Sequence, residues 1–78
     1  MEQIKLIWDF RGPNAQPTAQ HHVVHLKEFA TIENIEYQIC DVQKITEMHY
    51  SAFMVVNKNL MNDLRERLKP NRGQIYNK

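Results

Sequence analysis

The chain has 78 residues, 42% of them hydrophobic and 24% charged, and its ten Lys and Arg against nine Asp and Glu give a net charge of +1. These values are typical of one compact domain, residues 1–78, near the lower size limit for a hydrophobic core, and they exclude disordered, collagen-like and coiled-coil chains. So small a net charge does not attract the whole chain to nucleic acid or to anionic lipid, and we expect neither as a partner.

The first predicted element is a strand over residues 4–10, where apolar residues alternate with mostly polar ones. Gly12-Pro13-Asn14 breaks this pattern and predicts a helix that begins at Asn14 or Gln16 and ends near Ala30. One side of this helix is apolar, so we expect it to pack on a sheet. That side consists of Ala15, Ala19, Val23, Leu26 and Ala30, flanked by His22 and Phe29.

Two further strands are predicted after this helix. Alternation over residues 35–40 indicates the second, and the nearly continuous apolar run over residues 48–56 indicates a third that is covered on both sides. The third strand is therefore expected in the middle of the sheet. Residues 44–47 contain no Gly or Asn, which predicts a connection longer than a tight turn.

A second helix is predicted to begin after Asn57 or Asn59 and to end before Pro70. Its last turn and the residues that follow are rich in cations, which interact favourably with a helix C-terminus. These cations are Arg65, Arg67, Lys69 and Arg72. We expect Gly73 to turn the chain and residues 74–76 to add a short edge strand.

The order of the predicted elements indicates an α+β fold of the ferredoxin-like βαββα(β) type. In such a sandwich an antiparallel sheet carries both helices on one face and leaves the other face open. The third strand then lies between the first and the second, in agreement with its apolar character.

A single cysteine, Cys40, rules out an internal disulfide and a cysteine-based zinc site. The N-terminal residues have no basic stretch followed by an apolar run, and no apolar stretch is long enough to span a membrane. We therefore expect a cytoplasmic location.

Three histidines lie within five residues of one another on the first predicted helix. His21 and His25 are four residues apart, so they lie on one side of the helix and are candidate metal ligands, with Glu28 continuing the row. A third ligand would have to come from Glu28, from Asp9, from His49 or from a second subunit. The alternative is that His21 and His25 are surface residues without a ligand.

His22 differs from its two neighbours because it falls inside the apolar side of the helix. We expect a structural role for this imidazole, which would stay neutral and satisfy its nitrogens by hydrogen bonds.

Four residues are candidates for ligand binding. Arg11 and Asn14 flank the start of the first helix, where backbone N–H groups and the helix dipole can hold an anion, although the segment also fits a plain connecting turn. His49 and Tyr50 are candidates if the protein is an enzyme with a small hydrophobic substrate in a cleft of the sheet. Neither Cys40 nor Ser51 has the sequence context of a nucleophile.

Because no catalytic set is indicated, we predict a non-enzymatic binding module that takes a small ligand or a protein partner at the open face of the sheet. Ile7, Cys40 and Val42 are expected to make this face apolar, and burying it against a second copy would stabilise so short a chain, which predicts a homodimer. The alternative is a small metal-dependent protein or enzyme that uses His21 and His25 together with His49 or Asp9. A divalent metal is the one cofactor considered.

Overall fold

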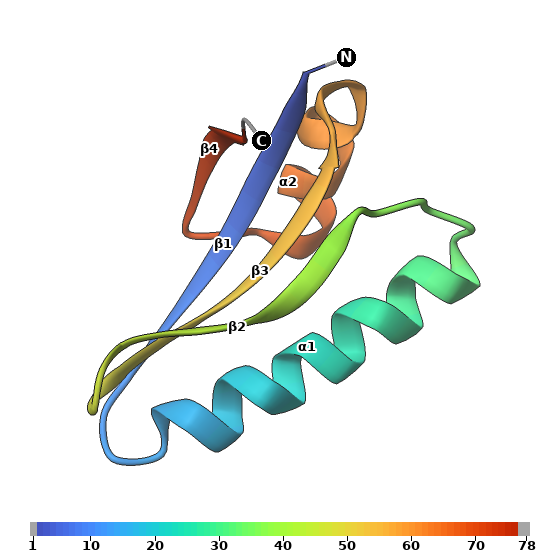
Figure 1. Cartoon of the computed structure of the whole chain (residues 1–78). Helices are drawn as coiled ribbons and strands as arrows, with labels where there is room; N and C mark the ends of the chain where they lie inside the picture. The colour runs from blue at the N-terminus through green and yellow to red at the C-terminus, as the bar shows by residue number, and fades with distance from the viewer. Residues whose placement is uncertain (1, 77–78) are drawn as a thin grey trace.

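The computed structural model describes residues 2–76, which form a four-stranded antiparallel sheet and two α-helices (Figure 1). In chain order the elements are β1 (Gln3–Arg11), α1 (Ala15–Ile32), β2 (Ile39–Thr46), β3 (His49–Asn57), the 3-10 turn η1 (Lys58–Leu60), α2 (Met61–Leu68) and β4 (Arg72–Tyr76). The strand order across the sheet is β2-β3-β1-β4. The predicted α+β class is confirmed, and so is the position of the third strand between the first and the second.

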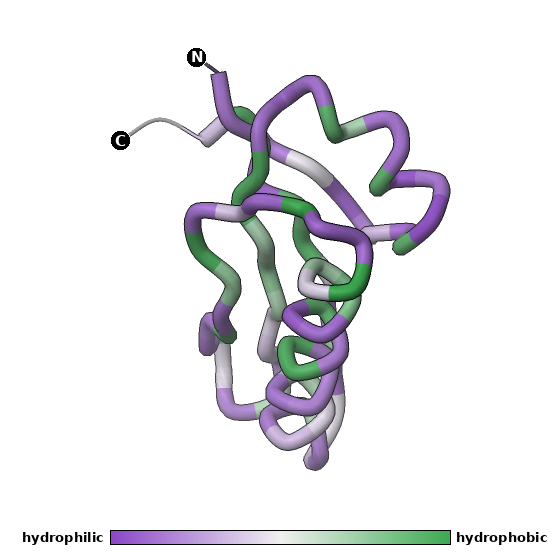
Figure 2. Tube along the Cα trace, turned by 90° about the vertical axis from the view of Figure 1, so that its right-hand side faces the viewer, coloured by the Kyte–Doolittle hydropathy of each residue, from purple (hydrophilic) through white to green (hydrophobic). Residues whose placement is uncertain are grey.

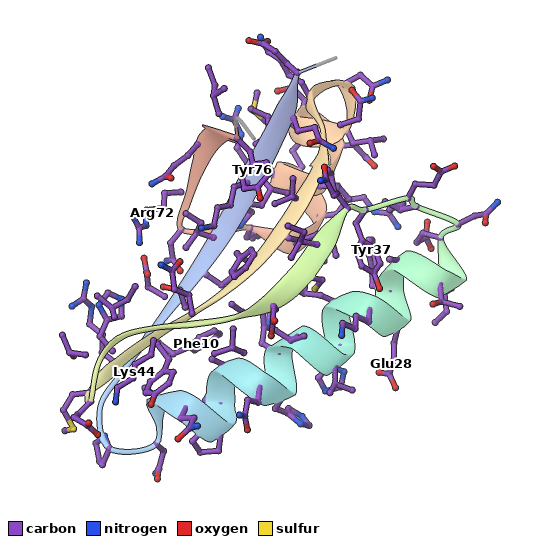
Figure 3. All side chains as sticks on the ribbon, viewed as in Figure 1. Phe10, Glu28, Tyr37, Lys44, Arg72 and Tyr76 are labelled. Carbon is purple, nitrogen blue, oxygen red and sulfur yellow. The ribbon has the colours of Figure 1, made fainter. Side chains whose placement is uncertain are left out.

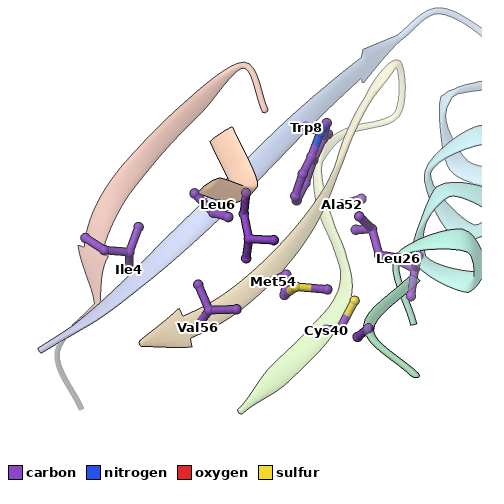
Figure 4. Packing of buried hydrophobic residues seen from close by; sticks show 11 residues of the cluster. Ile4, Leu6, Trp8, Leu26, Cys40, Ala52, Met54 and Val56 are labelled. Atoms are coloured by element: carbon purple, nitrogen blue, oxygen red, sulfur yellow. The ribbon is translucent and has the colours of Figure 1, made fainter. Parts of the chain in front are cut away.

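The core lies on one face of the sheet because alternate residues of β1 and β3 are apolar. Leu6 pairs with Met54 across the two strands, and each of these side chains is 1% exposed. Both helices contribute to the same cluster, α2 through Leu64 and α1 through Leu26, which Figure 4 shows beside Ala52, Met54 and Cys40. Trp8 adds a polar link to this packing, since its indole N–H donates to the backbone oxygen of Leu68 at 2.9 Å.

Helix α1 buries the side that the sequence predicts. Its buried residues are Ala15, Ala19, Val23, Leu26 and Ala30. Figure 2 shows how hydrophobic and hydrophilic residues recur along this helix, as expected where one side packs and the other meets water. Among residues 2–76, neither this helix nor any other is long and apolar enough to cross a membrane.

Strand β2 begins four residues later than the alternation over residues 35–40 predicts. Residues 35–38 instead belong to the connection from α1 over residues 33–38, in which Asn34 adopts a φ of 59° and the N–H of Ile35 donates to the oxygen of Ala30 at 2.8 Å. Ile35 packs against the core from this connection. The alternation was misleading because a loop residue that closes a helix end can be as apolar as a strand residue.

The connection between β2 and β3 is a two-residue turn, not the longer loop that residues 44–47 predict. Thr46 pairs directly with His49, and one irregularity of register lies between Lys44 and Thr46. Gly or Asn is not needed at this turn because neither Glu47 nor Met48 has a positive φ. The Lys44 ammonium contacts the Glu47 carboxylate at 2.8 Å, and the Thr46 hydroxyl accepts from the N–H of Met48 at 3.2 Å.

The C-terminal edge strand is confirmed and is two residues longer than predicted. The chain turns at Lys69, whose φ is 50°, whereas Gly73 lies inside β4 and pairs with Leu6. The turn expected at Gly73 was therefore placed too late. Asn57 caps the other end of the second helical segment, because its side chain accepts from the N–H of Asn59 at 3.3 Å.

Candidate functional site: the open face of the sheet

The side of the sheet opposite the helices is called the open face here. It is formed by alternate residues of all four strands, and Figure 3 shows Arg72 and Tyr76 on β4 at one edge. Its members are Gln3, Lys5, Ile7, Asp9 and Arg11 of β1, Ile39, Asp41 and Gln43 of β2, His49, Ser51, Phe53, Val55 and Asn57 of β3, and Arg72, Gln74 and Tyr76 of β4.

One row of the open face runs across all four strands, in the order Asp41, Phe53, Ile7, Arg72. Its centre is apolar and its two ends carry opposite charges. Ile7 is only 3% exposed within the single chain, and Val55 in the adjacent row is fully buried. The Lys5 ammonium lies 4.4 Å from the centre of the Phe53 ring, so a cation borders the apolar centre as well.

Cys40 and Val42 do not lie on the open face, contrary to the sequence-based expectation. Cys40 pairs with Met54 and faces the helices, and Val42 packs against the same core. Ile39 and Phe53 contribute apolar surface to the open face in their place. Burial raises the pKa of the Cys40 thiol to about 11, an effect that Asp41 adds to and Lys27 opposes, so the thiol is protonated at neutral pH.

A network of polar side chains surrounds Asp9 on the open face. One carboxylate oxygen accepts from the Ser51 hydroxyl at 2.8 Å and from His49 Nε2 at 3.0 Å. The Arg72 guanidinium spans both oxygens, with its Nε and Nη2 each at 3.2 Å. The backbone N–H of Asp9 donates to the side chain of Asn71 at 2.8 Å. Asp9 thereby joins β1 to β3 and to the segment that begins β4.

Partial burial raises the pKa of Asp9, but the hydrogen bonds from Arg72, His49 and Ser51 outweigh it and hold this pKa well below its ordinary value. Ser51 and His49 donate to the same oxygen, and Ser51 is 2% exposed. In a catalytic triad the histidine instead takes the proton of the serine. The network therefore links β1 to β3, and His49 is directed at Asp9 and not placed to take the proton of the Ser51 hydroxyl.

The four predicted ligand-binding residues do not form one site. Arg11 and His49 are cross-strand partners at one end of the open face. Tyr50 points to the opposite side, where it is 8% exposed and packs against Ala15 and Ala19 of α1, so His49 and Tyr50 do not share a cleft. Asn14 is exposed at the start of α1, and its side chain makes no capping hydrogen bond.

The structure brings His21, His25 and Glu28 together on the exposed side of α1. His21 Nε2 lies 2.8 Å from His25 Nε2, and His25 Nδ1 lies 3.3 Å from Glu28 Oε1. His49 and Asp9 lie on the open face, across the sheet from α1, and do not join them. Within residues 2–76, no cluster of three or more His, Cys, Asp and Glu has the arrangement of a metal site.

His22 lies against the rings of Trp8 and Phe10, with ring centres 5.1 and 5.4 Å away, as its place in the apolar side predicts. Its pKa is lowered by burial and by the charges of His25 and His21, which favours the neutral imidazole. The hydrogen bond expected at Nε2 is not made, because this buried nitrogen has no partner among the described residues.

Arg72 and Asn71 are the site residues that sequence analysis missed. Arg72 was assigned to the basic cluster that follows the second helix. Extending the predicted strand over residues 74–76 by two positions would have placed Arg72 on the same side as Gln74 and Tyr76, but nothing in the sequence indicates that extension. Asn71 acts from outside the strand, which no periodic pattern reveals.

Comparison of the chain with known protein families, with curated proteins and with solved structures finds no match in any of the three. Functional inference therefore depends on the geometry described above.

Proposed function

We propose that the protein is a small binding module with a ferredoxin-like fold that associates with a second copy of itself through the open face. The fold assignment is supported by the βαββαβ order of the elements and by the two central strands, β1 and β3, which the outer strands flank. Association is supported by the short chain, because a domain of 78 residues alone buries a smaller fraction of its surface than a larger domain does.

The observation that carries the proposal is the row Asp41, Phe53, Ile7, Arg72. With strands about 4.8 Å apart, the two charges stand about 14 Å from each other on either side of the apolar centre. A two-fold axis between the facing sheets, parallel to the strands and midway between β3 and β1, sets each Asp41 against the partner's Arg72. The same axis sets Phe53 against the partner's Ile7. The row is thus complementary to itself, as a symmetric dimer requires.

Arg72 can contact the partner's Asp41 while it stays bound to Asp9 of its own chain. Its side chain remains 46% exposed while it binds the Asp9 carboxylate, so one side of the guanidinium is available to a partner. An apolar centre with charged residues around it is also the usual anatomy of a protein interface.

A non-enzymatic role is supported by the surroundings of two groups that could act as nucleophiles, the Ser51 hydroxyl and the Cys40 thiol. The Ser51 hydroxyl is hydrogen-bonded to a carboxylate, and the Cys40 thiol is buried and protonated at neutral pH. A cytoplasmic location is part of the proposal, and its support is the single, buried, unpaired cysteine of the described chain.

The proposal is tested by the oligomeric state of a matched pair of variants. Phe53→Glu introduces a charge at the centre of the open face, and we expect the dimer dissociation constant to rise at least about 30-fold, as for the loss of a central interface residue. Val24→Glu makes the same change at an exposed residue of α1 and should leave dimerisation unchanged. Equal behaviour of the two variants would refute the proposed interface.

A second pair of variants tests the charge arrangement. Asp41→Lys sets a cation against the partner's Arg72 and should weaken the dimer by about 10-fold. Glu66→Lys makes the same change of charge on exposed α2 and should have no effect. If the wild-type chain stays monomeric, the open face does not bind a second copy, and a different protein or a small ligand becomes its candidate occupant.

A further inference from the structure

We propose that His21 and His25 form a two-nitrogen chelating site for Cu²⁺ or Ni²⁺ on the exposed side of α1, with Glu28 as the residue that positions His25. The site is independent of the dimer proposed above, because α1 packs on the face of the sheet opposite the open face.

The separation of the two imidazole nitrogens supports the proposal. His21 Nε2 and His25 Nε2 are 2.8 Å apart, although the residues lie on successive turns of the helix. Two imidazole nitrogens bound at about 2.05 Å are about 2.9 Å apart when they occupy adjacent positions at 90°, and about 3.3 Å apart in a tetrahedral site. The observed spacing is that of a hydrogen bond between the two rings, and it already holds the two nitrogens close to the separation of adjacent positions in the square-planar, tetragonal or octahedral geometry of Cu²⁺ and Ni²⁺.

Glu28 determines which nitrogen of His25 is available. Its Oε1 lies 3.3 Å from His25 Nδ1, and a carboxylate at this distance favours the tautomer with the proton on Nδ1 and the lone pair on Nε2. A carboxylate behind a metal-binding histidine fixes the orientation of the ring and increases the basicity of the ligand nitrogen. Glu28 therefore acts through His25 and is a positioning residue, not a ligand.

The two rings have the freedom and the access that metal binding needs. The side chains of His25 and Glu28 are 58% and 63% exposed, and the ring planes of His21 and His25 stand at 82° to each other. A small rotation about χ2, which is a soft torsion for histidine, directs both Nε2 lone pairs at one point. Neutral His21 binds the metal through Nε2 only as its Nδ1–H tautomer, so the proton shared by the two Nε2 atoms moves by way of solvent to His21 Nδ1. Water fills the remaining coordination positions.

Titration of the full-length chain with Cu²⁺ at pH 7.5, in competition with a chelator of known affinity, tests the site. We expect one ion per chain with a dissociation constant below about 10 µM. His21→Ala and His25→Ala should each weaken binding at least about 30-fold, and Glu28→Gln about 10-fold, at the lower end of the effect of such supporting carboxylates. Alanine favours helix, so both histidine variants should keep the wild-type circular dichroism spectrum.

His49→Gln is the matched control, because it removes a histidine on the open face and should leave Cu²⁺ affinity unchanged. Binding weaker than about 10 µM, or binding that survives His25→Ala, overturns the site. Affinity unchanged in Glu28→Gln overturns the positioning role.

A metal series tests the geometry. Cu²⁺ should bind most tightly and Ni²⁺ more tightly than Zn²⁺, and the electron paramagnetic resonance spectrum of the Cu²⁺ complex should contain coupling to two equatorial imidazole nitrogens. Tighter binding of Zn²⁺ than of Ni²⁺, or coupling to a single nitrogen, overturns the chelating pair. Because the site is remote from the open face, these results do not depend on whether the chain dimerises.

Discussion

Replacement of Asp9 by Asn tests the role assigned to the polar network on the open face. The carboxylate accepts hydrogen bonds from Ser51, from His49 and, through two nitrogens, from Arg72. An asparagine of the same shape offers one neutral oxygen to these donors. Its amide nitrogen then faces the Arg72 Nε as a second donor, so the best orientation still loses the charge and one hydrogen bond.

The expected loss follows from these contacts. A hydrogen bond to a charged group contributes about 1.5–3 kcal/mol and a neutral one about 0.5–1.5 kcal/mol. Arg72 is 46% exposed and regains hydration when its partner is lost, which reduces the effect. We expect Asp9→Asn to lower the free energy of unfolding by about 2 kcal/mol at pH 7, and the melting temperature by roughly 10 °C for a domain of this size.

The same change should alter the response to acid. Because the pKa of Asp9 is lowered in the folded state, its stabilisation is complete above the ordinary value of 3.8 and is lost as the pH falls from there toward the folded-state pKa. Thermal unfolding followed by circular dichroism between pH 7 and pH 2 should therefore give a flatter acid dependence for Asp9→Asn. Glu36→Gln, at an exposed position, is the control. A melting temperature within 2 °C of wild type would refute the reasoning.

Two further predictions concern the backbone and the thiol. Lys69→Gly should raise the free energy of unfolding by roughly 1 kcal/mol, because Lys69 has a φ of 50° that glycine adopts without strain, and denaturant unfolding that finds no gain would contradict this. Cys40 should react with a thiol reagent far more slowly in the native chain than after denaturation, since its pKa is raised to about 11, and equal rates in the two states would count against its burial.

The core residues could be predicted from the sequence because apolar residues recur with the spacing of a helix in α1 and with the alternation of a strand in β1. The buried side of α1 and the alternate apolar residues of β1 follow directly from spacing, and the apolar run of β3 predicts its central place. The outer strand β2 shows no such regular spacing, because it lies at the edge of the sheet and its apolar residues alternate only weakly with polar ones. Its start was misplaced by four residues. Cys40 and Val42 were assigned to the wrong face because the set of Ile35, Tyr37 and Ile39 was taken to face the helices, whereas Ile39 lies on the open face.

The candidate site was harder to predict because its residues meet across long distances in sequence. Asp9 contacts Ser51 and Arg72, which lie 42 and 63 positions away. Their meeting depends on the register of three strands, which local patterns do not determine. His21 and His25 are the opposite case, because a spacing of four within a helix fixes their proximity directly.

Sedimentation equilibrium of the wild-type chain between about 1 and 100 µM tests the central claim, recognition through the open face by a second copy, most directly. The proposed dimer predicts a mass that approaches twice 9.3 kDa as the concentration rises, and a return to the single-chain mass in Phe53→Glu. A mass of 9.3 kDa for the wild type throughout this range would contradict the account.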